Sequence, residues 1–145
     1  MSINILNAYQ DFTWENFSLI GKEISKIDRE DINGELVQHP MIFQQYMSLL
    51  GMSKRELDEA NNNLLTLASL LRKSYKEEAG SKKITAKDLD DLVFGDPKYS
   101  AALDEASAAN HKYLMVKGMV TTLEHKKDCL VQLSSNSRQE TKLYS

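Results

Sequence analysis

The chain contains few of the residues that interrupt or cross-link helices. Two prolines and six glycines in 145 residues favour long helices over a β-sandwich or a barrel. Cys129 is the only cysteine, which excludes an intrachain disulfide and a cysteine-rich zinc site. No apolar run approaches the roughly 18 residues of a membrane-spanning helix, and the first ten residues lack the features of a secretory signal. We therefore expect one all-α domain over residues 1–145 with no membrane partner.

Motifs of catalysis and cofactor binding are also absent. Neither Gly-rich phosphate-binding motif occurs. The histidines His39, His111 and His125 are far apart and lack the Glu-x-x-His spacing of di-metal helical bundles. Paired carboxylates such as Asp90 and Asp91 are typical of a solvated surface. These features disfavour a metal-dependent helical-bundle enzyme, so we expect no catalytic residues, no metal and no cofactor.

The first long helix is expected over residues 40–79. Pro40 suits a first helical position because its missing N–H would be unpaired there, and Gly80 suits the C-terminal stop. Inside this segment, Gly51 precedes a stretch, Ser53–Glu56, that has the spacing of a capping box. Either the helix bends there or two helices abut, and we favour a single helix with a weak point.

Capping residues divide the rest of the chain. Thr13, Thr85 and Asp96 are each placed to cap a helix, Asp31 is placed to cap a further short turn, and Gly95 closes the helix that starts at Thr85. The expected segments are a loosely ordered N-terminus (1–12), short helices (13–39), the first long helix (40–79), a loop with a short helix (80–96), a second long helix (97–137) and a tail that frays (138–145).

Both long helices carry an apolar seam. From Phe43 to Ser74 the seam alternates spacings of three and four residues, which is typical of coiled-coil-like packing. In the second helix the seam is less regular, with Asn110 and Lys127 near core positions. Two antiparallel helices make a thin hairpin, so we expect a homo-oligomer. The seam residues are Tyr46, Leu50, Leu57, Leu64, Leu67, Leu71, Tyr113, Val120, Leu123 and Leu130.

Basic residues gather at the end of the first long helix and in the loop beyond it. With one aromatic residue they are Arg72, Lys73, Tyr75, Lys76, Lys82 and Lys83. Two interpretations stay open. Basic residues near a helix C-terminus are favoured by the helix dipole, and in a closed ring the same patch would repeat into a positive track for a phosphate backbone. In the second case Tyr75 would stack on a base.

The net charge does not decide between these interpretations. A formal charge of −3 argues against nucleic-acid binding by gross charge alone, but an acidic average can hide a local basic face. A second basic group, Lys112, Lys117, Lys126 and Lys127, is interspersed with acidic residues, which predicts a solvated, salt-bridged surface there.

Several stretches follow one another in an order found in a known family. They are Trp14–Phe17 (WENF), Asp31–Val37 (DINGELV), Met41–Tyr46 (MIFQQY), Glu56–Ala60 (ELDEA) and Leu70–Tyr75 (LLRKSY), followed by Leu103, Tyr113, Val120 and the span from Leu123 to Leu133. By this pattern the chain resembles the UvsY-type recombination mediator proteins of T-even-like bacteriophages. The likeness covers most of the chain and lies in pattern and length rather than in a signature motif.

The resemblance implies a small, non-catalytic, all-helical protein that assembles into a ring of six or seven copies. Proteins of this family bind single-stranded DNA, contact the phage recombinase and single-strand-binding protein, and help the recombinase displace the latter in the host cytoplasm. Their DNA contacts include basic residues late in the first long helix, which here are Arg72 and Lys73, with Lys76 one turn on. The alternative is a structural helical adaptor whose seam serves self-association without nucleic-acid binding.

Overall fold

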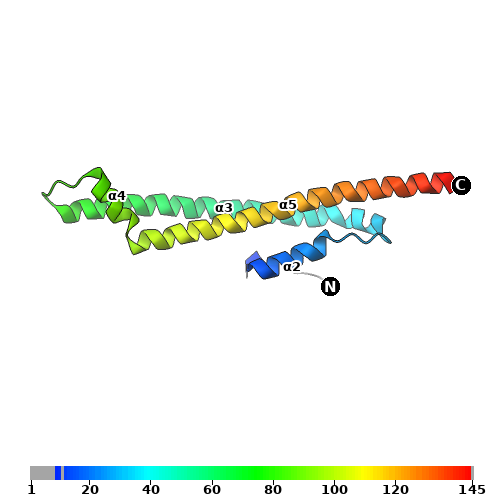
Figure 1. Ribbon diagram of the computed structural model, residues 1–145, viewed down its shortest axis with the longest axis horizontal. Coiled ribbons are helices and arrows are strands. Elements are labelled where there is room, and N and C mark those ends of the chain that lie inside the picture. Colours follow the sequence, from blue (N-terminus) through cyan, green and yellow to red (C-terminus); the bar gives the residue numbers. More distant parts are fainter. Residues whose placement is uncertain (1–8, 11, 145) are drawn as a thin grey trace. The chain divides into compact units, whose positions relative to one another are not determined.

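The computed structural model describes Tyr9, Gln10 and residues 12–144. In chain order the helices are α2 (Trp14–Ser25), α3 (Ile32–Ala79), α4 (Ala86–Phe94) and α5 (Pro97–Tyr144) (Figure 1). No strand occurs in this described part. The prediction of an all-α fold with two long helices, a short N-terminal helix and a short helix between the long ones is confirmed.

The N-terminal segment is less loose than predicted wherever it is described. Tyr9 is only 2% exposed and belongs to a hydrophobic core, and Phe12 packs against that core. The rings of Phe12 and Phe17 lie 5.4 Å apart. Aromatic side chains bury a large area, so two of them anchor this segment although it has no helical period. Residues 1–8 and 11, the rest of the predicted loose segment, lie outside the described residues.

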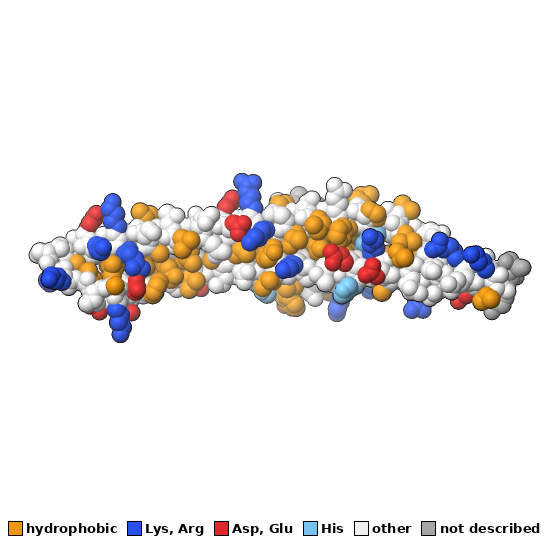
Figure 2. All heavy atoms as spheres, turned by 90° about the horizontal axis from the view of Figure 1, so that it is seen from above, with side chains coloured by type: hydrophobic (Ala, Val, Ile, Leu, Met, Phe, Trp, Pro, Cys, Tyr) orange, Lys and Arg blue, Asp and Glu red, His pale blue; other side chains and the backbone are white. Residues whose placement is uncertain are grey.

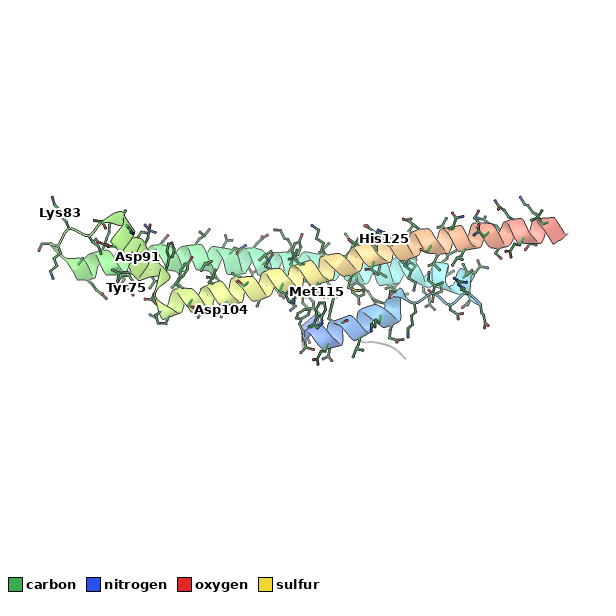
Figure 3. The ribbon with its side chains drawn as sticks, in the orientation of Figure 1. Tyr75, Lys83, Asp91, Asp104, Met115 and His125 are labelled. Atoms are coloured by element: carbon green, nitrogen blue, oxygen red, sulfur yellow. The ribbon has the colours of Figure 1, made fainter. Side chains whose placement is uncertain are left out.

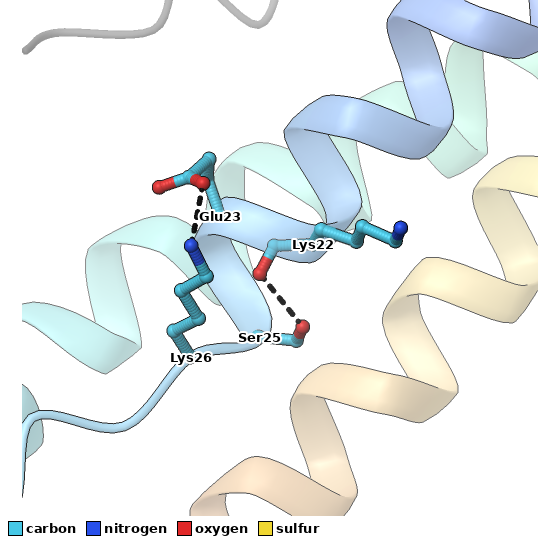
Figure 4. Close-up of polar contacts among 4 residues, drawn as sticks. All are labelled: Lys22, Glu23, Ser25 and Lys26. Atoms are coloured by element: carbon cyan, nitrogen blue, oxygen red, sulfur yellow. Dashed lines mark hydrogen bonds and ion pairs between the residues drawn. The ribbon is translucent and has the colours of Figure 1, made fainter.

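α2 begins at its predicted cap. The hydroxyl of Thr13 accepts a hydrogen bond, 3.2 Å long, from the backbone N–H three residues later, which is the usual N-cap geometry. At the other end Lys26 Nζ pairs with Glu23 Oε1 at 2.8 Å, and Ser25 Oγ donates to the carbonyl of Lys22 at 3.1 Å (Figure 4). These local contacts close the last turn before the backbone becomes extended at Lys26.

α3 begins at Ile32, so the prediction that the first long helix starts at Pro40 is wrong. Asp31 is the cap, and its Oδ1 accepts a hydrogen bond from the backbone N–H of Gly34 at 3.1 Å. Pro40 lies inside the helix, where its missing N–H leaves the carbonyl of Leu36 without the usual helical bond. The short turn predicted after Asp31 is therefore the first part of α3.

Tertiary contacts explain why the helix continues through Pro40. His39 is buried, and Glu35 forms an ion pair with Lys126 of α5, with 2.7 Å between Oε2 and Nζ. These contacts hold the turns before Pro40 against α5, and they outweigh the local preference of proline for a first helical position.

α3 also runs without interruption through Gly51 and ends at Ala79. A single helix, the favoured alternative, is therefore observed. The residues with capping-box spacing do not cap a helix. Ser53 is fully buried, and Glu56 forms an ion pair with Lys112 at 3.4 Å. Gly80, with a φ of 59°, is the predicted C-terminal stop, since glycine adopts this left-handed conformation without steric cost.

The later helices keep their predicted starts. The hydroxyl of Thr85 accepts from Asp88 N at 3.1 Å, and Gly95 is the C-cap of α4. Asp96 Oδ1 accepts from Lys98 N at 2.8 Å and caps α5.

The sequence predicts a tail that frays from residue 138, but α5 continues to Tyr144, so this prediction is wrong. Its polar side chains bond within the helix: Thr141 Oγ1 donates to the carbonyl of Ser137 at 3.0 Å, and Gln132 donates to Asn136 at 3.2 Å. With no glycine or proline in this stretch, nothing local stops the helix.

Contacts among the described residues gather into two compact units. Unit 1 contains the described residues of 1–51 and 114–145, and unit 2 is Met52–Tyr113. In each unit a stretch of α3 packs antiparallel to a stretch of α5. In unit 1, Glu35 pairs with Lys126, whereas Tyr46, later on α3, clusters with Val120, earlier on α5. The sequence predicts one domain over 1–145, and these two units are its observed subdivision.

Unit 1 has an aromatic core that joins α2, α3 and α5. Its buried members are Tyr9, Phe17, Tyr46, Leu49, Val116, Val120 and Leu123. The rings of Phe17 and Tyr46 meet edge to face at 6.5 Å, a favourable arrangement for aromatic pairs. Burial raises the pKa of Tyr46 to about 12, so this phenol stays neutral at physiological pH.

Unit 2 has a smaller aliphatic core that joins α3, α4 and the start of α5. Leu57, Leu71, Leu89, Val93 and Ala106 are its buried apolar residues. α4 carries two of them, Leu89 and Val93, on one face. This anchoring places α4 beside the C-terminal part of α3, where the basic residues lie (Figure 1).

The seam residues lie on the inner faces of α3 and α5. Six of them are buried, namely Tyr46, Leu57, Leu71, Val120, Leu123 and Leu130, and four are half-buried, namely Leu50, Leu64, Leu67 and Tyr113. Asn110 and Lys127, expected near core positions, are exposed. In unit 1 the seam is covered by the chain itself, because Tyr46, Val120 and Leu123 share one core. These three seam residues of unit 1 are therefore not available for self-association.

Candidate nucleic-acid interface

The residues of the predicted DNA-binding site all belong to unit 2. Arg72, Lys73 and Lys76 lie in the last turns of α3, and Lys82 and Lys83 lie in the loop between α3 and α4. Gly80 reverses the chain between the two groups. Thus the helix end and the loop bring these cations to one end of the unit.

Arg72 is paired within the chain. Its guanidinium lies 2.6 Å from Asp90 Oδ1 of α4, and the two side chains are 43% and 40% exposed. An ion pair with this exposure is weak, because water and salt screen it. The contact still sets the resting position of Arg72, and it partly neutralises the residue that the resemblance places first among the DNA contacts.

Tyr75 is also engaged. Its hydroxyl donates to Asp96 Oδ2 at 2.6 Å, while Asp96 Oδ1 caps α5. The hydrogen bond from Tyr75, together with one from the backbone of Lys98, lowers the pKa of Asp96 below its ordinary value, and the same bond raises the pKa of Tyr75. Asp96 is therefore ionised and Tyr75 neutral at physiological pH. Tyr75 is half-buried, and its hydroxyl is hydrogen-bonded to the residue that caps α5.

The remaining cations are open to solvent. Lys73, Lys76, Lys82 and Lys83 are all exposed. In Figure 3 Lys83 projects from the loop away from α3 and α4, and Tyr75 lies on α3 beside the start of α5. Among the described residues none of these four lysines forms an ion pair. These four lysines are therefore the residues of the predicted site that are accessible to a phosphate.

This end of unit 2 is not basic as a whole. From Arg72 to Asp96 the basic residues are Arg72, Lys73, Lys76, Lys82, Lys83 and Lys87, and the acidic residues are Glu77, Glu78, Asp88, Asp90, Asp91 and Asp96. Six of each sign give a local net charge of zero. Figure 2 shows the two kinds intermixed on the visible face of this end. A strand bound here would meet individual cations rather than a uniformly positive surface.

The second basic group contains a residue that sequence reasoning misplaced. Lys126 is not part of a solvated face: it is buried, and its Nζ contacts Glu35 Oε2 at 2.7 Å and the carbonyl of Ile24 at 2.8 Å. Near it, His39 is 5% exposed, and burial together with the charges of Lys126 and Lys127 lowers the pKa of His39.

No periodic signal distinguishes Lys126 from its exposed neighbour Lys127. The role of Lys126 depends on where α2 and α3 bring a carbonyl and a carboxylate. We assign the pair of Lys126 and Glu35 to the stability of unit 1, because Lys126 contacts Glu35 and the carbonyl of Ile24.

In the part of the chain that is described, no group of three or more His, Cys, Asp or Glu side chains is placed to hold a metal ion. Among the described helices, none is both long and apolar enough to cross a membrane.

Comparison with known proteins finds no match to this chain among family models, curated proteins or solved structures. The likeness to the UvsY-type mediators therefore rests on the sequence pattern alone.

Proposed function

We propose that this protein is a non-catalytic recombination mediator that binds single-stranded DNA as a homo-oligomer. It would help load a recombinase onto DNA covered by single-strand-binding protein, in the host cytoplasm of a bacteriophage infection. The order of the resembling stretches supports the family, and the all-helical fold agrees with what the family implies. No bond is made or broken in this role, which needs a surface for DNA and surfaces for partners.

The observation that carries the DNA-binding part is the group of four exposed lysines in unit 2. Lys73, Lys76, Lys82 and Lys83 stand around the end of α3, where one chain offers only a few cations. A ring of six or seven copies repeats the group around its axis. Since each phosphate contact releases counterions, the repeated group would bind a strand that a single copy holds weakly.

Exposed apolar residues support self-association. Unit 2 exposes Leu65 at 68%, Leu70 at 60%, Phe94 at 56% and Leu103 at 44%. Single exposed apolar residues are ordinary, but this small unit buries only five apolar residues. With so few apolar residues inside, exposed leucines and a phenylalanine on α3, α4 and α5 favour contact with another copy.

Fluorescence anisotropy of a labelled oligo(dT) tests the DNA site. The change is Lys82→Ala with Lys83→Ala, and the matched control is Lys22→Ala with Lys142→Ala, which removes the same charge from unit 1. We expect the loop variant to bind more weakly and to lose about 1.4 from the slope of log K against log salt, or about 0.7 for each phosphate contact. The control should retain the wild-type slope.

Equal slopes for wild type, loop variant and control would remove these lysines from the site. Full-length protein that binds no oligonucleotide at low salt would overturn the DNA-binding proposal altogether.

The alternative, a structural adaptor without nucleic-acid binding, is favoured by one observation. The local charge from Arg72 to Asp96 is zero, which is unusual for a surface that binds DNA through phosphates. Under this alternative the exposed apolar residues would mediate assembly, and the lysines would only solvate the end of α3. Oligonucleotide binding separates the two functions directly.

A further inference from the structure

Two side chains of the candidate DNA site are each bound to a carboxylate of unit 2. Arg72 pairs with Asp90 at 2.6 Å, and the hydroxyl of Tyr75 donates to Asp96 at 2.6 Å. One carboxylate lies on α4 and the other caps α5. Both come from outside α3, so the fold brings each of them to its partner.

A DNA phosphate is able to replace Asp90 as the partner of Arg72. An exposed Arg–carboxylate pair gains little in water, and a guanidinium binds a phosphate with the same planar, two-pronged geometry that it uses for a carboxylate. A phosphate that approaches Arg72 therefore competes with Asp90 on similar terms. Because Leu89 and Val93 anchor α4 in the core, Asp90 stays close after it is displaced and is ready to pair again.

The Tyr75 contact differs in one respect. Asp96 uses Oδ2 for Tyr75 and Oδ1 for the cap of α5. Release of the tyrosine hydroxyl therefore leaves the cap intact, so Tyr75 is able to turn toward a base without unravelling the start of α5. The ring remains half-buried while the bond is made.

We propose that α4 acts as a built-in competitor for the DNA site: Asp90 occupies Arg72 in the free protein, and a bound strand must displace it. This inference rests on the proposed function. Its consequence is a lower affinity per copy than the cations alone would give. Stable binding then requires several copies to engage one strand, which favours the assembled ring over the single chain.

Asp90→Asn tests the competitor, and the neighbouring Asp91→Asn is its matched control. Both substitutions remove one negative charge from α4, but only Asp90 pairs with Arg72, while the side chain of Asp91, labelled in Figure 3, is exposed. We expect Asp90→Asn to bind oligo(dT) about two- to five-fold tighter, the range of a weak exposed ion pair. Its salt slope should stay at the wild-type value, because the bound strand contacts Arg72 in both proteins and the number of phosphate contacts is unchanged.

A smaller gain is expected for Asp91→Asn, with the wild-type slope. In the background of Asp90→Asn, the further change Arg72→Gln should abolish the gain, and far-UV circular dichroism should show unchanged helix content in each variant.

Equal gains for Asp90→Asn and Asp91→Asn would overturn the inference, because general charge would then explain both. No gain for Asp90→Asn in a wild-type protein that does bind DNA would also overturn it, while the proposed function stands. Absence of binding by every form would overturn the proposed function instead.

Discussion

Lys126→Met perturbs a buried ammonium group that joins three helices of unit 1. The Lys126 side chain is 7% exposed, and its Nζ lies 2.7 Å from Glu35 Oε2 of α3 and 2.8 Å from the carbonyl of Ile24 near the end of α2. Methionine keeps the apolar stem in place and removes both polar contacts. The free energy of unfolding should therefore fall by the cost of leaving a carboxylate and a carbonyl unpaired.

The size of this cost follows from burial. Removing one partner of a fully buried ion pair costs roughly 3–5 kcal/mol. The Glu35 side chain is 22% exposed, so water partly rehydrates its carboxylate and the loss lies below that range. The carbonyl of Ile24 loses a charged donor, which adds about 1 kcal/mol or more. We expect Lys126→Met to lower the free energy of unfolding by about 2–4 kcal/mol.

Urea unfolding followed by circular dichroism at fixed protein concentration measures this loss, since self-association makes stability depend on concentration. The matched control is Lys127→Met, which makes the same change at the exposed neighbouring position and should alter stability by less than about 0.5 kcal/mol. Adding Glu35→Gln to Lys126→Met should recover part of the loss, because it removes the unpaired charge. Equal effects of Lys126→Met and Lys127→Met would show that the contacts of Lys126 with Glu35 and Ile24 do not stabilise unit 1.

Three further predictions concern unit 1 and α3. Burial, followed by Lys126 and Lys127, lowers the pKa of His39 from 6.5, against an opposing effect of Glu35. His39 thus contributes stability that is complete above pH 6.5 and is lost as the pH falls toward the folded-state pKa. His39→Gln should flatten this decline in urea midpoints, and an unchanged pH profile would contradict the assignment. Gly51→Ala should raise the free energy of unfolding by about 0.5–1 kcal/mol, because an added Cβ meets nothing within 4 Å in the middle of α3. Thermal melts measure this change, and a lower melting temperature for Gly51→Ala would contradict the prediction. Tyr46→Phe should leave stability unchanged or higher, since its buried hydroxyl has no hydrogen-bond partner among the described residues and its removal lifts a desolvation cost. A loss above about 1 kcal/mol would show that the hydroxyl has a partner.

Helix ends that depend on neighbouring residues could be predicted from the sequence. Thr13, Thr85 and Asp96 each cap a helix through a side-chain oxygen and a nearby backbone N–H, and Gly80 stops α3 through its own backbone conformation. Such contacts span two or three residues, so the local sequence contains all that is needed to recognise them.

Features that depend on distant residues could not be predicted. Pro40 lies inside α3 because Lys126, which is far away in the sequence, pairs with Glu35 in the turn before the proline. The burial of Lys126 itself depends on where α2 ends. In the candidate site, the cations were visible in the sequence, but the pairing of Arg72 with Asp90 required knowing that α4 folds back on α3. Composition reports how many charges are present, not which of them meet.

Native mass spectrometry of the full-length protein, with and without oligo(dT), tests the central proposal most directly. We expect a closed oligomer, of six or seven copies by the resemblance, that gains the mass of the oligonucleotide when it is added. A monomer or dimer whose mass is the same with and without the oligonucleotide would contradict the mediator function and favour the structural adaptor.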